Sequence, residues 1–145
     1  MDVKFFEDNA DRSHVLDVLT QLRPHFSQDA LAAQITRQQK SGYQLAYVKS
    51  DNIVLAVVGF EMRENLAWGK HIYIDDLVTN ENHRSQGVGK ALMEWLKNHA
   101  AEHDCKQIHV DSEIQRFKAH IFYQREDFKT IAHHFVFAGK AGKAR

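Results

Sequence analysis

The spacing of apolar residues predicts helices in the first third of the chain. Apolar positions recur every three or four residues from Val15 to Leu22 and from Leu31 to Ile35, as on one face of an amphipathic helix. Asp11 or Ser13 is expected to cap the first helix, which should stop at Arg23 because a proline follows. Ser27 or Asp29 should cap the second, and Gly42 should end it.

The rest of the chain alternates between β-branched or aromatic runs and further amphipathic segments. The runs predict strands at Val3–Phe6, Tyr43–Val48, Ile53–Met62, His71–Thr79, Gln107–Asp111 and Phe128–Ala138. The amphipathic segments predict helices from Gly87 to about His103 and from Lys118 to about Arg125. This order predicts an α/β (α+β) fold: a single mixed, mostly antiparallel sheet flanked by helices.

Composition narrows the class of protein. With 145 residues, 43% of them hydrophobic, the chain can fill one core, so we expect one domain over 1–138 and a flexible tail over 139–145. Nineteen basic residues balance nineteen acidic ones, which argues against nucleic acid or an anionic membrane as a partner. The longest apolar run, Ile53–Phe60, is too short to span a bilayer, and no signal peptide opens the chain, so a cytoplasmic protein is predicted. The sequence is compatible with a homodimer.

A glycine turn at Arg84-Ser85-Gln86-Gly87-Val88-Gly89 precedes the third predicted helix. Free amides at the start of a helix, together with the helix dipole, favour a bound phosphate. Gly87 and Gly89 leave the backbone open, while Arg84 and Lys90 can add positive charge. The turn therefore predicts a pyrophosphate site, although two glycines alone can also be a mere helix start.

Nucleotide ligands fit this turn poorly. A P-loop needs Ser or Thr after Gly-Lys to bind magnesium, and Ala91 follows Lys90 here. A dinucleotide fingerprint needs Gly or Ala three residues after Gly89, where this chain has Leu92. The spacing thus disfavours nucleotide hydrolysis and dinucleotide binding.

Two motifs together resemble the GCN5-related N-acetyltransferase (GNAT) family. The first is Leu77-Val78 followed by the turn from Arg84 to Gly89, and the second is Ala119 followed by Phe122-Tyr123 and, after Asp127, by Phe128. Arg116 stands where the family often has Asn, and Asp127 stands where it has Gly. Since Asp tolerates a left-handed backbone better than most residues, we expect the turn at position 127 to survive.

The resemblance implies a GNAT-like fold that binds acetyl-coenzyme A as co-substrate, in a gap between the strands 71–79 and 107–111. Backbone groups of Leu77, Val78 and Thr79 would hold the pantetheine and the acetyl oxygen. The amides from Gln86 to Lys90 would hold the pyrophosphate, and Arg116 can compensate by its charge for the Asn that it replaces. The residues implied in this contact are Arg84, Gln86, Gly87, Val88, Gly89, Lys90 and Arg116.

Acetyl transfer to an amine needs a proton acceptor for the ammonium and a proton donor for the leaving thiolate. Tyr123 is implied by the resemblance as the acid, with a core aromatic as its alternative role. Asp75 is our first candidate for the base and His71 the second; Asp75 can equally bind a cationic substrate. Regular strand alternation sends Asp75 and Asp76 to opposite faces.

No metal is predicted. His99 and His103 share one helix face, but Ala100 replaces the Glu of a zinc-protease helix and no third ligand is apparent.

The predicted activity is N-acetylation, by direct attack, of a primary amine on a small-molecule acceptor. A non-catalytic module that binds acyl-coenzyme A, and a protein or peptide N-acetyltransferase, are the alternatives.

Overall fold

A computed structural model describes residues 2–84 and 87–140 of the chain. The chain divides into two compact units, Met1–Val110 and Asp111–Arg145, which are described separately. The first unit contains β1 (Asp2–Phe5), α1 (Arg12–Leu22), α2 (Gln28–Gln39), β2 (Tyr43–Ser50), β3 (Ile53–Asn65), β4 (Gly69–Thr79), α3 (Val88–Glu102) and β5 (Gln107–Val110). The second contains α4 (Phe117–Arg125). No helix of the described chain has the length and apolar character needed to cross a membrane.

One five-stranded sheet, in the order β1-β2-β3-β4-β5, organises the first unit. The pairs from β1 to β4 are antiparallel, and β5 is parallel to β4. The prediction of a mixed, mostly antiparallel sheet is therefore confirmed. The parallel pair follows from the chain path, since α3 lies between β4 and β5 as a crossover connection.

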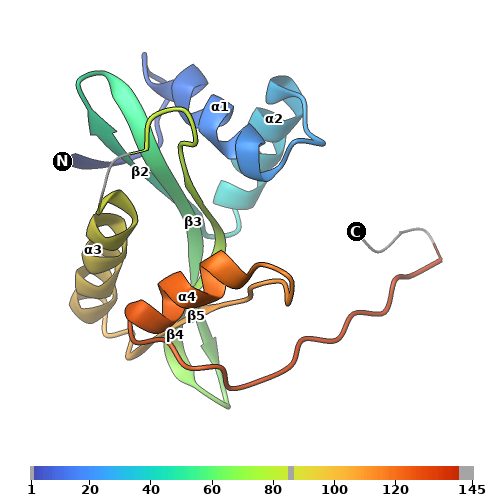
Figure 1. Cartoon of the computed structure of the whole chain (residues 1–145). Coiled ribbons are helices and arrows are strands. Elements are labelled where there is room, and N and C mark those ends of the chain that lie inside the picture. Colours follow the sequence, from blue (N-terminus) through green and yellow to red (C-terminus); the bar gives the residue numbers. More distant parts are fainter. Residues whose placement is uncertain (1, 85–86, 141–145) are drawn as a thin grey trace. The chain divides into compact units, whose positions relative to one another are not determined.

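Helices cover both faces of this sheet, with α1 and α2 on one face and α3 on the other (Figure 1). On the first face, Val15 and Leu19 of α1 pack in one apolar cluster with Tyr43, Leu45 and Tyr47 of β2. On the second face, Trp95 of α3 packs edge-on against the buried ring of Phe60, with ring centroids 6.3 Å apart. Each large apolar side chain buried in this way contributes about 1.5–3 kcal/mol.

The two predicted caps behave differently. Ser27 caps α2 as expected, because its hydroxyl accepts a hydrogen bond from the amide of Ala30 at 3.2 Å. Asp11 stands at the N-cap of α1 but makes no side-chain cap bond. Its carboxylate instead accepts from Tyr47 Oη at 2.6 Å and pairs with Lys49 Nζ at 2.8 Å, so it ties α1 to β2.

The second unit confirms one prediction and corrects another. Asp127 follows α4 with φ of 68°, the left-handed conformation expected there. The strand predicted at Phe128–Ala138 is wrong, because these residues form no strand in the structure. Residues with high β propensity favour a strand because their side chains pack well on a pleated, half-buried sheet. Such a sheet needs a neighbouring strand, so propensity alone does not form one. The apolar side chains Ile131, Phe135, Val136 and Phe137 are accordingly exposed. Of the predicted tail, residues 141–145 lie outside the described part.

Candidate active site

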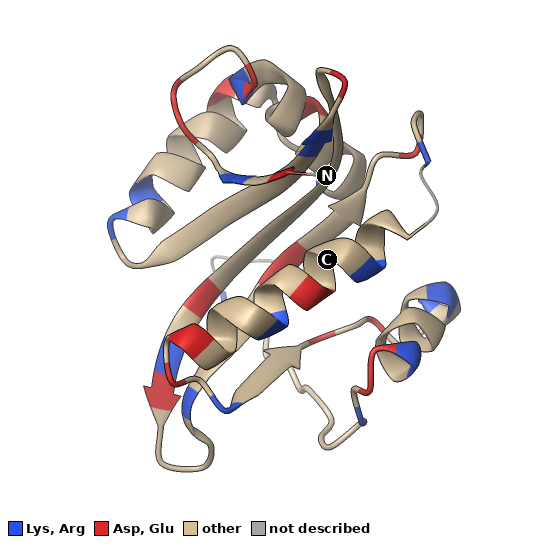
Figure 2. Cartoon of the chain, turned by 90° about the vertical axis from the view of Figure 1, so that its left-hand side faces the viewer, with Lys and Arg blue, Asp and Glu red and all other residues tan. Residues whose placement is uncertain are grey.

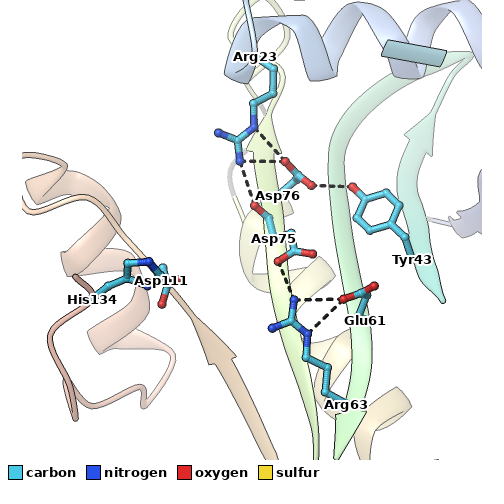
Figure 3. Close-up of polar contacts among 8 residues, drawn as sticks. All are labelled: Arg23, Tyr43, Glu61, Arg63, Asp75, Asp76, Asp111 and His134. Atoms are coloured by element: carbon cyan, nitrogen blue, oxygen red, sulfur yellow. Dashed lines mark hydrogen bonds and ion pairs between the residues drawn. The ribbon is translucent and has the colours of Figure 1, made fainter. Parts of the chain in front are cut away.

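An irregularity in the β3–β4 ladder lies at the two acidic residues of β4. Gly59 pairs with Asp76 and Phe60 pairs with Ile74, so Asp75 is an extra residue on its strand, as in a β-bulge. The extra residue resets the alternation of side chains. Regular alternation, which would send Asp75 and Asp76 to opposite faces, does not hold at this bulge: both contact side chains on the face that carries α1 and α2 (Figure 3).

Asp76 lies in a polar network that joins three elements. Its Oδ1 accepts from Arg23 Nε at 3.0 Å and lies 2.9 Å from Arg23 Nη2, at the end of α1. Its Oδ2 accepts from Tyr43 Oη at 2.6 Å. Burial, and then the negative charge of Asp76, raise the pKa of Tyr43, so the phenol remains a donor. These contacts give Asp76 a role in positioning the bulge.

Asp75 is more accessible than Asp76, with a side chain that is 33% exposed compared with 16%. Its carboxylate lies 3.6 Å from Arg63 Nη2, and the same guanidinium pairs with Glu61 Oε2 at 3.1 Å (Figure 3). Arg63 also lies over the ring of Tyr73, 4.6 Å from its centroid. Two carboxylates, a guanidinium and an aromatic ring thus form a partly exposed polar surface on β3 and β4.

His71, the second candidate base, is almost completely enclosed. It is 1% exposed, and its Nδ1 lies 2.8 Å from the carbonyl oxygen of Gly69. The rings of Trp68 and His109 pack against it at 5.4 and 5.0 Å. Its Nε2 is buried without a hydrogen-bond partner among the described residues. Solvent and ligand therefore reach Asp75 more easily than His71.

Strand β4 extends beyond its partner β5. The parallel pairing runs from His71 with Gln107 to Ile74 with Val110, where β5 ends, while β4 continues to Thr79. The stretch from Leu77 to Thr79 stays paired with β3 on one edge. In the described chain no strand pairs with the other edge, and these residues are only half-buried. Main-chain groups on that edge are available to a ligand.

Helix α3 begins with an open amino terminus. Gly87, at its N-cap, has φ of 83°, a conformation that favours glycine, and a Cβ built there would meet no atom within 4 Å. Among the described residues no side chain caps the helix, and its first turn carries no acidic residue. The first amides of an α-helix, here those of Val88, Gly89 and Lys90, have no acceptor within the helix itself. Arg84 is exposed, and Gln86 lies outside the described residues.

Charge on α3 is mixed. Lys90, Glu94, Lys97 and Glu102 alternate in sign along the helix, as the blue and red segments of Figure 2 show. The helix therefore presents no patch of a single sign, in keeping with the balanced charge of the chain. A positive potential at its start comes from the helix dipole and from Lys90.

Tyr123 and Arg116 belong to the second unit. Tyr123 is 9% exposed on α4 and packs edge-on against Phe122 and Phe128, with centroids 5.5 and 5.6 Å away. Burial raises the pKa of Tyr123, and the positive charge of Arg116 at the N-cap of α4 opposes that rise. A raised pKa keeps the phenol protonated at neutral pH, which is the form that a general acid needs.

Three site residues have no local signal in the sequence. Arg23, Tyr43 and Arg63 become part of the site through contacts with the bulge, and Arg23 and Tyr43 are 53 and 33 residues away from Asp76 along the chain. In the sequence, Arg23 stands at an ordinary helix end, and Tyr43 and Arg63 stand at ordinary strand positions.

The profile of the Acetyltransferase (GNAT) family matches residues 12–128, most of the chain. The chain is a member of the GNAT acetyltransferase family. It is similar to the "Uncharacterized N-acetyltransferase YhdJ" of Bacillus subtilis (strain 168), with 33% identity over 85 residues, or 59% of this chain. That match spans 60% of the relative's length.

Solved structures share the fold at low sequence identity. The aminoglycoside 6'-N-acetyltransferase AAC(6')-IG from Acinetobacter haemolyticus superposes with a TM-score of 0.79 at 16% identity, covering 97% of this chain and 99% of that one. The aminoglycoside N-acetyltransferase AAC(6')-Iy, solved in complex with CoA, gives a TM-score of 0.82 at 14% identity, covering 96% and 94%. The predicted GNAT fold is confirmed.

Proposed function

We propose that this protein transfers an acetyl group from acetyl-CoA to a primary amine of a small-molecule acceptor. The observation that carries the proposal is the parting of β4 from β5 after Ile74, on the chain segment that leads to the open start of α3. One feature offers main-chain groups to a pantetheine arm and the other offers amides to a pyrophosphate. Aminoglycosides, named for two structural neighbours, are small molecules with amines, which supports an acceptor of this class.

In the proposed donor site, the main chain of Leu77, Val78 and Thr79 holds the pantetheine and the acetyl oxygen. The amides from Gln86 to Lys90 hold the pyrophosphate, with Arg84 and Arg116 adding positive charge. Gly87 supports this arrangement because its position leaves the space around its Cα open. Main-chain recognition of this kind depends little on side-chain identity, so it tolerates the low identity to other members.

In the proposed reaction, the neutral amine attacks the acetyl carbonyl carbon directly, forming the C–N bond and then breaking the C–S bond. Asp75 accepts the proton that the ammonium must lose, since it is the more accessible of the two candidate bases. Tyr123 donates a proton to the coenzyme A thiolate as it leaves. Glu61 lies within the same polar surface as Asp75 and supports binding of a cationic acceptor.

The test is thiol release from acetyl-CoA across a panel of amines, which includes polyamines, amino sugars, amino acids and short peptides. We expect turnover with at least one small amine. Asp75→Asn should lower turnover strongly, whereas Asp8→Asn, which changes a carboxylate with a 96% exposed side chain, should not.

Binding of coenzyme A without turnover of any amine would instead indicate a non-catalytic acyl-CoA-binding module. Turnover of peptides alone would assign the activity to protein acetylation.

A further inference from the structure

We propose that His99, Glu102 and His103, at the carboxyl end of α3, form a zinc site, independent of acetyl transfer. The sequence shows the two histidines but no third ligand. In the structure Glu102 joins them: one ligand atom from each residue lies within 4.8 Å of the other two. Spacing of three and four residues along a helix places all three side chains on one face.

The orientation of His103 fits metal binding. Its Nδ1 lies 2.8 Å from the carbonyl oxygen of His99, which fixes the ring with Nδ1–H as donor. This leaves the lone pair of Nε2 for an ion. Metal-ligating histidines commonly donate their second ring N–H to a carbonyl in this way, which sets the tautomer and the direction of the ring.

The ring of His99 is held in place by aromatic neighbours. It stacks on Trp95 with an interplanar angle of 13° and a centroid separation of 4.9 Å, and it also packs against Phe5 and Phe60. The ring of His103 lies 4.3 Å away. Nε2 of His99 is buried and has no hydrogen-bond partner within the described chain. A cation bound at Nε2 would give this buried atom the polar partner that it lacks.

The donor set matches zinc. Two imidazole nitrogens and one carboxylate oxygen form three protein ligands, and tetrahedral Zn²⁺ leaves the fourth position to water. Zinc bonds of about 2.0–2.2 Å in a tetrahedral site place the ligand atoms about 3.3 Å from one another. The ligand atoms of these three residues lie within 4.8 Å of one another, so each distance must shorten by less than about 2 Å. His103 and Glu102 are exposed and can rotate to do this, while His99 stays fixed.

The site is remote from the proposed donor site along the same helix. Gly87 opens α3 and His99 lies twelve residues later, which corresponds to about 18 Å of helix. Zinc bound at the end of α3 would link the helix end to the aromatic cluster around Trp95. Thermal stability should therefore increase with zinc, while coenzyme A binding at the start of the helix should not require it.

The experiment is zinc titration of the full chain, free of any affinity tag, followed by calorimetry and by competition with a chromophoric zinc indicator. We expect one high-affinity site per chain and a higher Tm with zinc. His103→Ala and Glu102→Gln should each weaken zinc binding by about tenfold or more. Both residues are exposed, so these variants should still fold.

The matched control is His133→Ala, an exposed histidine of the second unit, which should leave zinc binding unchanged. Absence of zinc binding to the wild-type chain would overturn the proposal. Equal affinities of His103→Ala and the wild type would overturn it as well, because the ion would then bind to other histidines. Coenzyme A binding serves as a separate readout of folding in every variant.

Discussion

Replacement of Gly59 by alanine should disrupt the polar network at the bulge. Gly59 lies opposite Asp76 in the β3–β4 ladder. A Cβ at this position would stand 1.7 Å from Tyr43 Oη, 2.4 Å from Cζ and 2.8 Å from Cε1. Since real Cβ contacts under 3.0 Å are essentially never seen, the phenol must move by more than 1 Å. Tyr43 is 5% exposed and holds Asp76, so it has little room to move.

The expected cost has two parts. Overpacking a well-filled core costs about 1–3 kcal/mol. Displacing the phenol also breaks its hydrogen bond to the Asp76 carboxylate, and such bonds to charged groups contribute about 1.5–3 kcal/mol. Gly59→Ala should therefore lower the free energy of unfolding by about 2.5–6 kcal/mol.

Urea denaturation followed by far-ultraviolet circular dichroism measures this loss. The informative control is a double-mutant cycle with Tyr43→Leu, which removes the three atoms that the new methyl group would meet. In that background Gly59→Ala should cost close to nothing, because alanine also restricts the unfolded chain more than glycine does. An equal cost of Gly59→Ala in both backgrounds would refute the explanation.

Two further predictions concern single residues. Tyr123→Phe should lower kcat and leave coenzyme A affinity nearly unchanged, because the phenol acts on the leaving thiolate. Steady-state kinetics measures kcat and calorimetry measures the affinity. An unchanged kcat would assign Tyr123 to the core. Hydrogen bonds from Lys49 and Tyr47 lower the pKa of Asp11 from its ordinary value of 3.8. Its stabilising effect is therefore present above that value and lost as pH falls through the lowered pKa. Asp11→Asn should flatten the loss of stability below about pH 4 in urea unfolding; an unchanged acid profile would contradict this.

The sequence predicts those elements that a regular pattern determines. The stripe of α3 and the β2–β3 hairpin follow from helical and strand periodicity, and both are present. Asp127 was expected in a left-handed turn because Asp tolerates that backbone, and its φ is positive. These features depend on neighbouring residues alone.

The features that the sequence does not predict depend on distant partners. A bulge at Asp75 arises from the pairing of β4 with β3, so alternation along β4 alone gives the wrong face. Arg23 and Tyr43 reach Asp76 only after the sheet and α1 have packed together. Phe128–Ala138 has the composition of a strand, yet these described residues form no strand. Long-range pairing of this kind leaves little trace in local periodicity.

The proposed donor site requires that an acyl-CoA binds at the open start of α3. Calorimetry of coenzyme A with the wild-type chain and with Gly89→Glu tests it most directly. An acidic residue in the first turn suits the helix dipole, so the variant should fold normally, yet its charge should repel the pyrophosphate. Gly139→Glu adds the same charge at an exposed position and serves as the control.

We predict binding by the wild type and by Gly139→Glu, and none by Gly89→Glu. Coenzyme A binding that survives in Gly89→Glu, or that is absent from the wild type, would contradict the account.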